Sequence, residues 1–234
     1  NVLHIMGRQR VGLLQLRVLR RAQPGAPAGA LFGPIEPLRS YNHLAKWLEK
    51  LRPPNHLALE AVGTTAMLRA LKALAKSGPL REPARFVPMH LEVEGERRNE
   101  GRNGGVLRGI RFLVAPASAA DDPWGAWSSL PPLRVAAKTD VVRLARALLL
   151  ERKMRSRKMP ILLEATCSRR HAYIMCKALA KAQQLSMLLS TEPSGISCMA
   201  RVTKRHGPHT PMDEVGNTAT IIRVMVWNSE YWRS

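Results

Sequence analysis

Residues 56–78 read HLALEAVGTTAMLRALKALAKSG, and residues 160–183 read PILLEATCSRRHAYIMCKALAKAQ. In each stretch, a short apolar run is followed by small residues and then by apolar residues spaced three to four apart. This order predicts a strand, a tight turn and an amphipathic helix. Leu-Glu-Ala recurs at Leu59 and Leu163, and Lys-Ala-Leu-Ala-Lys recurs at Lys72 and Lys177. The chain therefore contains an internal repeat.

The segments around the two stretches correspond as well. A helix is predicted before each repeated strand, and two further strands are predicted after each repeated helix. The last strand of each copy carries an Ile-Arg step, at Ile110-Arg111 and Ile222-Arg223. The predicted fold class is therefore α/β, of the two-layer α+β kind, with the order β-α-β-α-β-β occurring twice. The predicted helices outside the repeated stretches cover residues 41–51 and 140–154, and the predicted strands there cover 30–35, 85–94, 106–115, 133–137, 195–204 and 218–227.

Two segments rich in Pro, Gly, Ser and Ala divide the chain. We expect a linker in the second of them, and its Trp124 and Trp127 are predicted to dock on a domain or a partner, since exposed indoles are costly. The expected organisation is a basic extension over residues 1–29, a first domain over 30–116, a linker over 117–132 and a second domain over 133–234.

The chain is strongly basic. Its 234 residues include 37 Lys and Arg against 17 Asp and Glu, which gives a formal net charge of +20. Such a balance indicates a polyanionic partner, with nucleic acid as the first candidate and an anionic membrane surface as the second. No apolar run approaches the roughly 18–20 residues that a membrane span needs, so no membrane insertion is expected. Three scattered cysteines indicate reduced thiols in an intracellular or organelle-matrix compartment.

The extension is basic and free of acids, because Glu36 is the first carboxylate of the chain. This composition is typical of an organelle transit region or of an RNA-binding arm, and we favour an arm that a nucleic acid holds in place. The arginines of this arm are Arg8, Arg10, Arg17, Arg20 and Arg21.

The segments VAAKTDVVRLARALL (135–149) and LEAVGTTAMLRALKALAK (59–76) resemble the Alba superfamily, and within it the family of stage V sporulation protein S. The resemblance covers roughly residues 30–116 and 133–228. It implies a compact α/β domain that often pairs and that binds DNA or RNA through the junction of its first strand and first helix and through its last hairpin. On this resemblance Lys138 matches the junction lysine. The first copy has Glu36 and Arg39 near that place, which puts nucleic-acid binding there in doubt, and the two copies could pair internally.

The position of Lys138 also suits an anion on physical grounds. Free backbone N–H groups and the helix dipole favour a phosphate where a strand passes into a helix. The alternative is a solvated lysine beside a helix cap at Thr139. Further cations occur in both predicted hairpins, in a dense run over residues 151–160 and at the start of the last helix. A mobile hairpin is the alternative for the hairpin cations, and a solvated face is the alternative for the dense run. The predicted RNA contacts outside the extension are Arg97, Arg98, Arg102, Lys138, Arg152, Lys153, Arg155, Arg157, Lys158, Arg169, Arg170, Lys204 and Arg205.

No motif indicates catalysis. Cys167, His171 and Cys176 lack the spacing of known metal motifs, so buried thiols are favoured over a metal site. Gly63-Thr64-Thr65 is not followed by the lysine of a phosphate-binding loop, so a helix cap is favoured over a nucleotide site. We therefore expect no enzyme activity, no cofactor and no metal.

These observations lead to one leading interpretation. The chain is expected to be a non-enzymatic RNA-binding component of a large organellar ribonucleoprotein, with the mitochondrial ribosome as first candidate. It would neutralise rRNA phosphates with Arg and Lys and contact neighbouring proteins through apolar surface. The expected location is the mitochondrial matrix, with plastid or cytoplasm as alternatives. The alternative function is a free-standing Alba-type regulatory or chromatin protein that binds DNA or mRNA.

Overall fold

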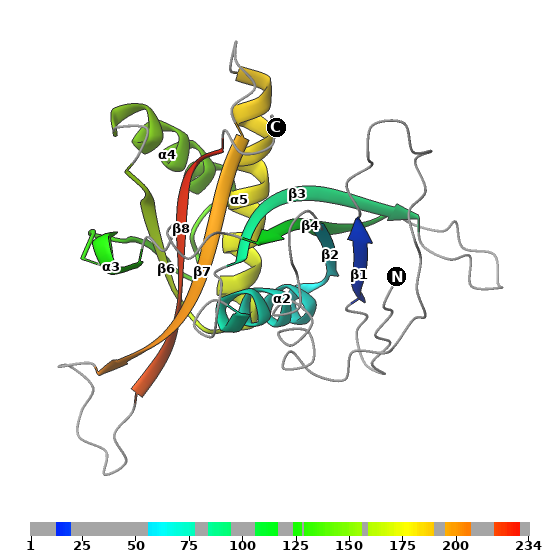
Figure 1. Ribbon diagram of the computed structural model, residues 1–234, viewed down its shortest axis with the longest axis horizontal. Coiled ribbons are helices and arrows are strands. Elements are labelled where there is room, and N and C mark those ends of the chain that lie inside the picture. Colours follow the sequence, from blue (N-terminus) through cyan, green and yellow to red (C-terminus); the bar gives the residue numbers. More distant parts are fainter. Residues whose placement is uncertain are drawn as a thin grey trace.

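The repeated segments form corresponding strand and helix units in the two halves of one sheet (Figure 1). The computed structural model describes residues 13–19, 56–77, 84–94, 106–116, 124–127, 129–155, 159–189, 195–206 and 218–229. The strands are β1 (Leu13–Leu19), β2 (His56–Val62), β3 (Ala84–Glu94), β4 (Val106–Pro116), β5 (Leu133–Val135), β6 (Ile161–Thr166), β7 (Gly195–His206) and β8 (Thr218–Ser229). The helices are α2 (Thr64–Ser77), α3 (Trp124–Trp127), α4 (Val141–Met154) and α5 (Arg169–Leu189).

The eight strands form one mixed sheet in the order β1-β2-β4-β3-β7-β8-β6-β5. Neighbouring strands are antiparallel except β5 and β6, which run parallel. Helices α2, α4 and α5 contribute to one core cluster with the sheet face that carries Leu59, Phe86 and Phe112. The α+β class is therefore confirmed. Four predicted strands are confirmed to within two residues, at 85–94, 106–115, 195–204 and 218–227. The predicted strand at 30–35 and the predicted helix at 41–51 lie outside the described residues.

The two repeats meet along β3 and β7, where Phe86 pairs with Cys198. The helix α2 of the first repeat packs against β7, and the helix α5 of the second repeat packs against β3. Each repeat thus covers a strand of the other, and one core cluster holds side chains from both. The predicted boundary between the two domains therefore falls within a structure in which both repeats share one sheet and one core cluster. The resemblance of each half to an Alba domain stays a prediction.

An additional strand lies inside the predicted basic extension. Residues Leu13–Leu19 form β1, which pairs antiparallel with β2 at the edge of the sheet. In the second repeat, the corresponding place beside β6 is taken by β5, which runs parallel. The sequence signal for β1 is an alternation in LLQLRVL, where Leu14, Leu16 and Val18 alternate with Gln15 and Arg17. The high arginine content of the extension concealed this period of two.

A buried ion pair occurs at the same place in both repeats. Glu60 of β2 accepts bonds from Nε and Nη2 of Arg111 of β4, at 2.7 and 2.6 Å. Glu164 of β6 likewise accepts bonds from Nε and Nη2 of Arg223 of β8, at 3.0 and 2.9 Å. The glutamates come from the two Leu-Glu-Ala segments and the arginines from the two Ile-Arg steps. Two bonds to one carboxylate compensate for the removal of its charge from water.

A smaller cluster covers the sheet face that is opposite to α5. It joins Trp124 of α3 to Leu162, Met199 and Met225, and Trp127 packs at its side. The linker tryptophans therefore dock on the second repeat, as the sequence predicted. Because α3 comes from the segment between the repeats, this contact fastens the linker to the sheet.

The cysteines differ in accessibility. Cys176 and Cys198 are fully buried, and their burial raises the pKa of both thiols well above the usual value. Cys167 is half-buried at the end of β6. All three are free thiols.

We expect a thiol reagent such as dithionitrobenzoate to label Cys167 of the native protein and to leave Cys176 and Cys198 unmodified. The thiolate is the reacting species, and burial suppresses both its formation and its access to the reagent. Absorbance should report one thiol per chain before denaturation and all 3 cysteines afterwards. Rapid labelling of a second thiol in the native state would contradict the packing of α5 against the sheet.

Candidate nucleic-acid interface

The turn between β5 and α4 places Lys138 at an exposed tip. Thr139 closes this turn twice, because its backbone N–H donates to Ala136 O at 3.0 Å and its Oγ1 accepts from Ala136 N at 2.8 Å. Asp140 then caps the helix, since its Oδ1 accepts from Arg143 N at 2.7 Å. The residue that caps α4 is thus Asp140, and the alternative that placed the cap at Thr139 is wrong.

The start of α5 brings two more cations to the same edge. Ser168 caps this helix, with its Oγ accepting from His171 N at 3.3 Å. Arg169 and Arg170 are exposed in the first turn, and Arg170 Nε donates to Ala137 O at 2.7 Å. This bond ties α5 to the turn that carries Lys138. We refer to Lys138, Arg169 and Arg170 as the junction cluster.

The two helix starts of the junction cluster differ in charge. The α4 start already has the Asp140 carboxylate on one of its free N–H groups, which weakens its attraction for another anion. The α5 start has a neutral serine cap and no acid in its first turn. The positive end of the α5 dipole and two arginines therefore act together, and α5 provides the stronger place for a phosphate.

The first repeat lacks these cations. Its corresponding helix α2 begins after Gly63, which adopts a φ of 88°, and continues with Thr64 and Thr65 where α5 has Arg169 and Arg170. A positive φ suits glycine because it has no Cβ. Glu36 and Arg39, where the resemblance put the first-copy junction, lie outside the described residues. Of the two helix starts, only that of α5 in the second repeat carries cations in its first turn.

The dense charge run that begins in the last turn of α4 makes internal contacts. Arg152 is half-buried and donates from Nη1 to Ser186 Oγ of α5 at 3.1 Å, and its burial lowers its pKa. Arg155 donates from Nε to Glu151 at 3.0 Å and from Nη1 to Pro160 O at 3.2 Å. Lys153 is exposed. The two arginines hold α4 and the following turn in place, so their side chains are less available to RNA than the sequence indicated.

The two hairpins point away from each other, with β7 and β8 extending well beyond the helices (Figure 1). Lys204 is exposed near the end of β7, and Arg205 lies in the same strand. Arg17 lies in β1, opposite Ala58. The predicted contacts outside the described residues are Arg8, Arg10, Arg20, Arg21, Arg97, Arg98, Arg102, Arg157 and Lys158.

The exposed cations that were not predicted from the sequence include Arg143, Arg146 and Arg201. Arg143 and Arg146 lie on α4, one and two turns after Lys138, and Arg201 lies on β7. The helical period could have identified the first two as extensions of the junction cluster. The position of Arg201 opposite Arg223 depends on the register between β7 and β8, which no local sequence pattern indicates.

The described residues offer no site for a metal ion, since no three His, Cys, Asp or Glu side chains gather among them. The His171 ring nitrogen Nδ1 lies 2.5 Å from Ser168 Oγ, while Cys176 is buried in the core. Within the same described part of the chain, no helix has the length and apolar character that would let it cross a membrane.

Comparison of the chain with protein-family models, curated proteins and solved structures finds no match.

Proposed function

We propose that the chain is a non-enzymatic RNA-binding protein that contacts RNA phosphates through the junction cluster of its second repeat. The observation that carries this proposal is the joining of Lys138, Arg169 and Arg170 at one sheet edge, beside a helix start without acids. Arginine and lysine at such a place neutralise phosphates and release counterions. The binding would depend on RNA shape more than on base identity, because phosphate contacts carry no sequence information.

The proposal extends to a place in a large organellar ribonucleoprotein, with the mitochondrial ribosome as first candidate. A net charge of +20 is more than a three-residue site needs, and it suits a protein surrounded by rRNA. Apolar side chains are also exposed near the ends of α4 and α5, with Met154 80% and Leu188 72% exposed. Such side chains suit contact with neighbouring proteins. An Alba-like free-standing protein is the second candidate, which the resemblance of the 135–149 segment favours.

Replacing Lys138, Arg169 and Arg170 together with glutamine should lower the affinity for RNA by about 10- to 100-fold at moderate salt. Three lost phosphate contacts should also reduce the slope of log affinity against log salt by about 2 on single-stranded RNA. Fluorescence anisotropy with a labelled RNA at several salt concentrations measures both values.

The matched control replaces Arg108, Lys177 and Lys181 with glutamine. It removes the same charge from β4 and the middle of α5, and it should have a smaller effect. Equal losses in the two variants would show that net charge, and not the junction cluster, determines binding. Unchanged affinity in the junction variant would reject the cluster as a contact. Co-sedimentation with ribosomal particles in high salt would favour the assembly component over the free-standing protein.

A further inference from the structure

The sheet face opposite to α5 carries a corresponding row of three side chains in each repeat. In the first repeat, Glu60, Arg111 and Met89 lie side by side across β2, β4 and β3. In the second repeat, the row across β6, β8 and β7 is Glu164, Arg223 and Arg201. The rows match at the ion pair and differ at the third place, where an arginine stands instead of a methionine.

When no ligand is bound, the arginine at the third place of the second row lowers the stability of the folded protein. Arg201 is directly opposite Arg223, and like charges in directly opposed positions destabilise a sheet. Glu164 does not offset the additional charge, because it is nearly buried and is already bound by two nitrogens of Arg223. Among the described residues, no ion pair involves Arg201. This row therefore has a surplus cation at an exposed position.

The linker helix holds this surplus cation in place. The Arg201 guanidinium lies over the ring of Trp124, 5.9 Å from its centroid, and Trp124 is only 7% exposed. An indole beneath the flat guanidinium stabilises it by a cation–π contact. Arg85 lies over the ring of Trp227 at 5.3 Å, where β3 meets the second repeat. One arginine–tryptophan pair thus lies within the second repeat, and another joins the first repeat to the second.

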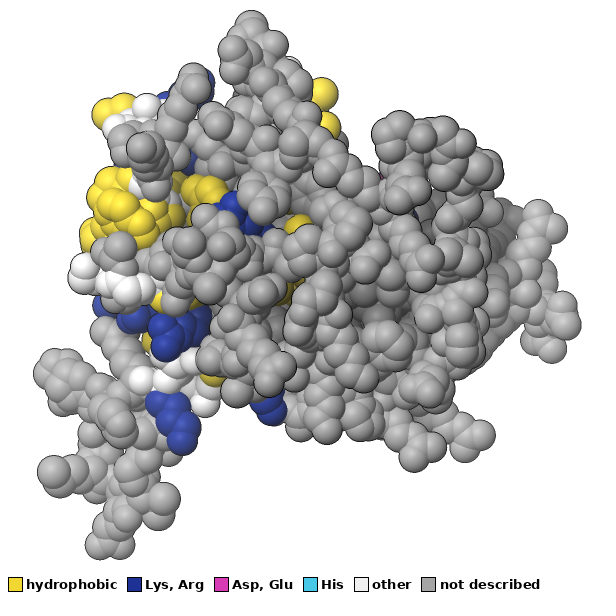
Figure 2. Space-filling model, viewed as in Figure 1, with side chains coloured by type: hydrophobic (Ala, Val, Ile, Leu, Met, Phe, Trp, Pro, Cys, Tyr) yellow, Lys and Arg dark blue, Asp and Glu magenta, His cyan; other side chains and the backbone are white. Residues whose placement is uncertain are grey.

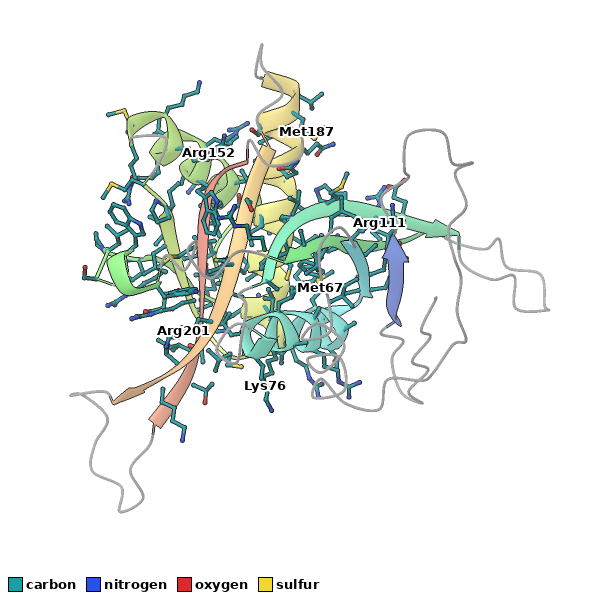
Figure 3. All side chains as sticks on the ribbon, viewed as in Figure 1. Met67, Lys76, Arg111, Arg152, Met187 and Arg201 are labelled. Atoms are coloured by element: carbon teal, nitrogen blue, oxygen red, sulfur yellow. The ribbon has the colours of Figure 1, made fainter. Side chains whose placement is uncertain are left out.

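The surface in this region combines charge and apolar area. Figure 2 shows Lys and Arg side chains next to a hydrophobic patch near α3, and Figure 3 shows Arg201 on the side of β7 toward α3. Trp127 is half-buried at the edge of the same cluster. An oriented guanidinium beside partly exposed aromatic surface matches the way proteins bind single-stranded nucleic acid, by phosphate contact and base stacking.

We propose that Arg201, held over Trp124, binds a backbone phosphate of single-stranded RNA on the sheet face of the second repeat that is opposite to α5. This contact rests on the proposed RNA-binding function and adds a second site, separate from the junction cluster. The phosphate offsets the repulsion between Arg201 and Arg223, so the arginine contributes to binding at a cost to the free protein.

The decisive variant is Arg201→Met, because it gives the second row the composition that the first row already has. The Glu–Arg–Met row folds in the first repeat, so the melting temperature should stay the same or rise. The affinity for a fluorescein-labelled single-stranded RNA of about 20 nucleotides should fall about five- to tenfold near 0.1 M salt. The salt slope should decrease by about 1. Lys181→Gln, which also removes one charge, should affect binding less.

Other outcomes separate this inference from the proposed function. Wild-type affinity in Arg201→Met, with weakened binding in the junction variant, would overturn the Arg201 contact and leave the proposed function standing. A lowered melting temperature with unchanged affinity would assign Arg201 a structural role and overturn the inference as well. If the wild-type protein binds no RNA at all, both the function and this contact are wrong.

Discussion

Replacing Arg111 with alanine is expected to lower the free energy of unfolding by about 3 kcal/mol. The Glu60 side chain is 2% exposed and is bound by two nitrogens of Arg111, so the substitution removes both of these bonds from a buried carboxylate. Loss of one partner of a buried pair typically costs about 3–5 kcal/mol, and the 36% exposure of the Arg111 side chain places this case at the lower end. Arg223→Ala should lower the free energy of unfolding by a similar amount, because the side chains of its pair are also mostly buried, with Glu164 6% and Arg223 27% exposed.

Urea unfolding followed by circular dichroism measures this loss. The matched control is Arg108→Ala, which removes the same side chain from the same strand. Arg108 and Glu92 form a pair whose side chains are 76% and 65% exposed, and such a pair contributes at most about 1 kcal/mol. Similar losses for Arg108→Ala and Arg111→Ala would contradict the structural role of the duplicated pair.

The second large effect is expected at the seam between the repeats. Phe86→Ala should lower the free energy of unfolding by about 3–5 kcal/mol. Phe86 is fully buried, pairs with Cys198 of the second repeat and meets the Phe112 ring edge-on, with centroids 5.6 Å apart. Its removal leaves a cavity where α5 and both hairpins meet, and such a cavity collapses only in part.

The same experiment tests whether the repeats unfold together. Because they share a sheet and a core, tryptophan fluorescence and circular dichroism should give coincident transitions in the wild-type chain and in Phe86→Ala. Leu188→Ala, at a residue that is 72% exposed, should change stability by less than about 0.5 kcal/mol. Separate transitions would show that the repeats are independent domains.

Much of the fold could be predicted from the internal repeat. The Leu-Glu-Ala and Ile-Arg segments marked the strands that hold the two ion pairs, and the hairpins followed from their apolar patterns. The shared seam could not be predicted, because the Phe86–Cys198 pairing joins residues that are far apart in sequence. β1 was missed because its arginine-rich surroundings suggested a free arm, although its residues alternate as in a strand.

The candidate site was predicted in part. Lys138, Arg169 and Arg170 were identified, and their meeting at one edge follows from the parallel pairing of β5 and β6. The internal bonds of Arg152 and Arg155 could not be predicted, because a charge pattern does not reveal which guanidinium groups find acceptors within the fold. Arg201 was missed because its position opposite Arg223 depends on strand register.

The claim that the second repeat holds RNA is tested most directly by ultraviolet crosslinking of the wild-type chain in the ribonucleoprotein particles that purify with it and are washed with high salt. Mass spectrometry of the crosslinked peptides identifies which residues touch nucleotides. We expect adducts on peptides that contain Lys138, Arg169 and Arg170, or Arg201. Adducts confined to the first repeat, or a chain recovered from such particles without any nucleotide, would contradict the claim.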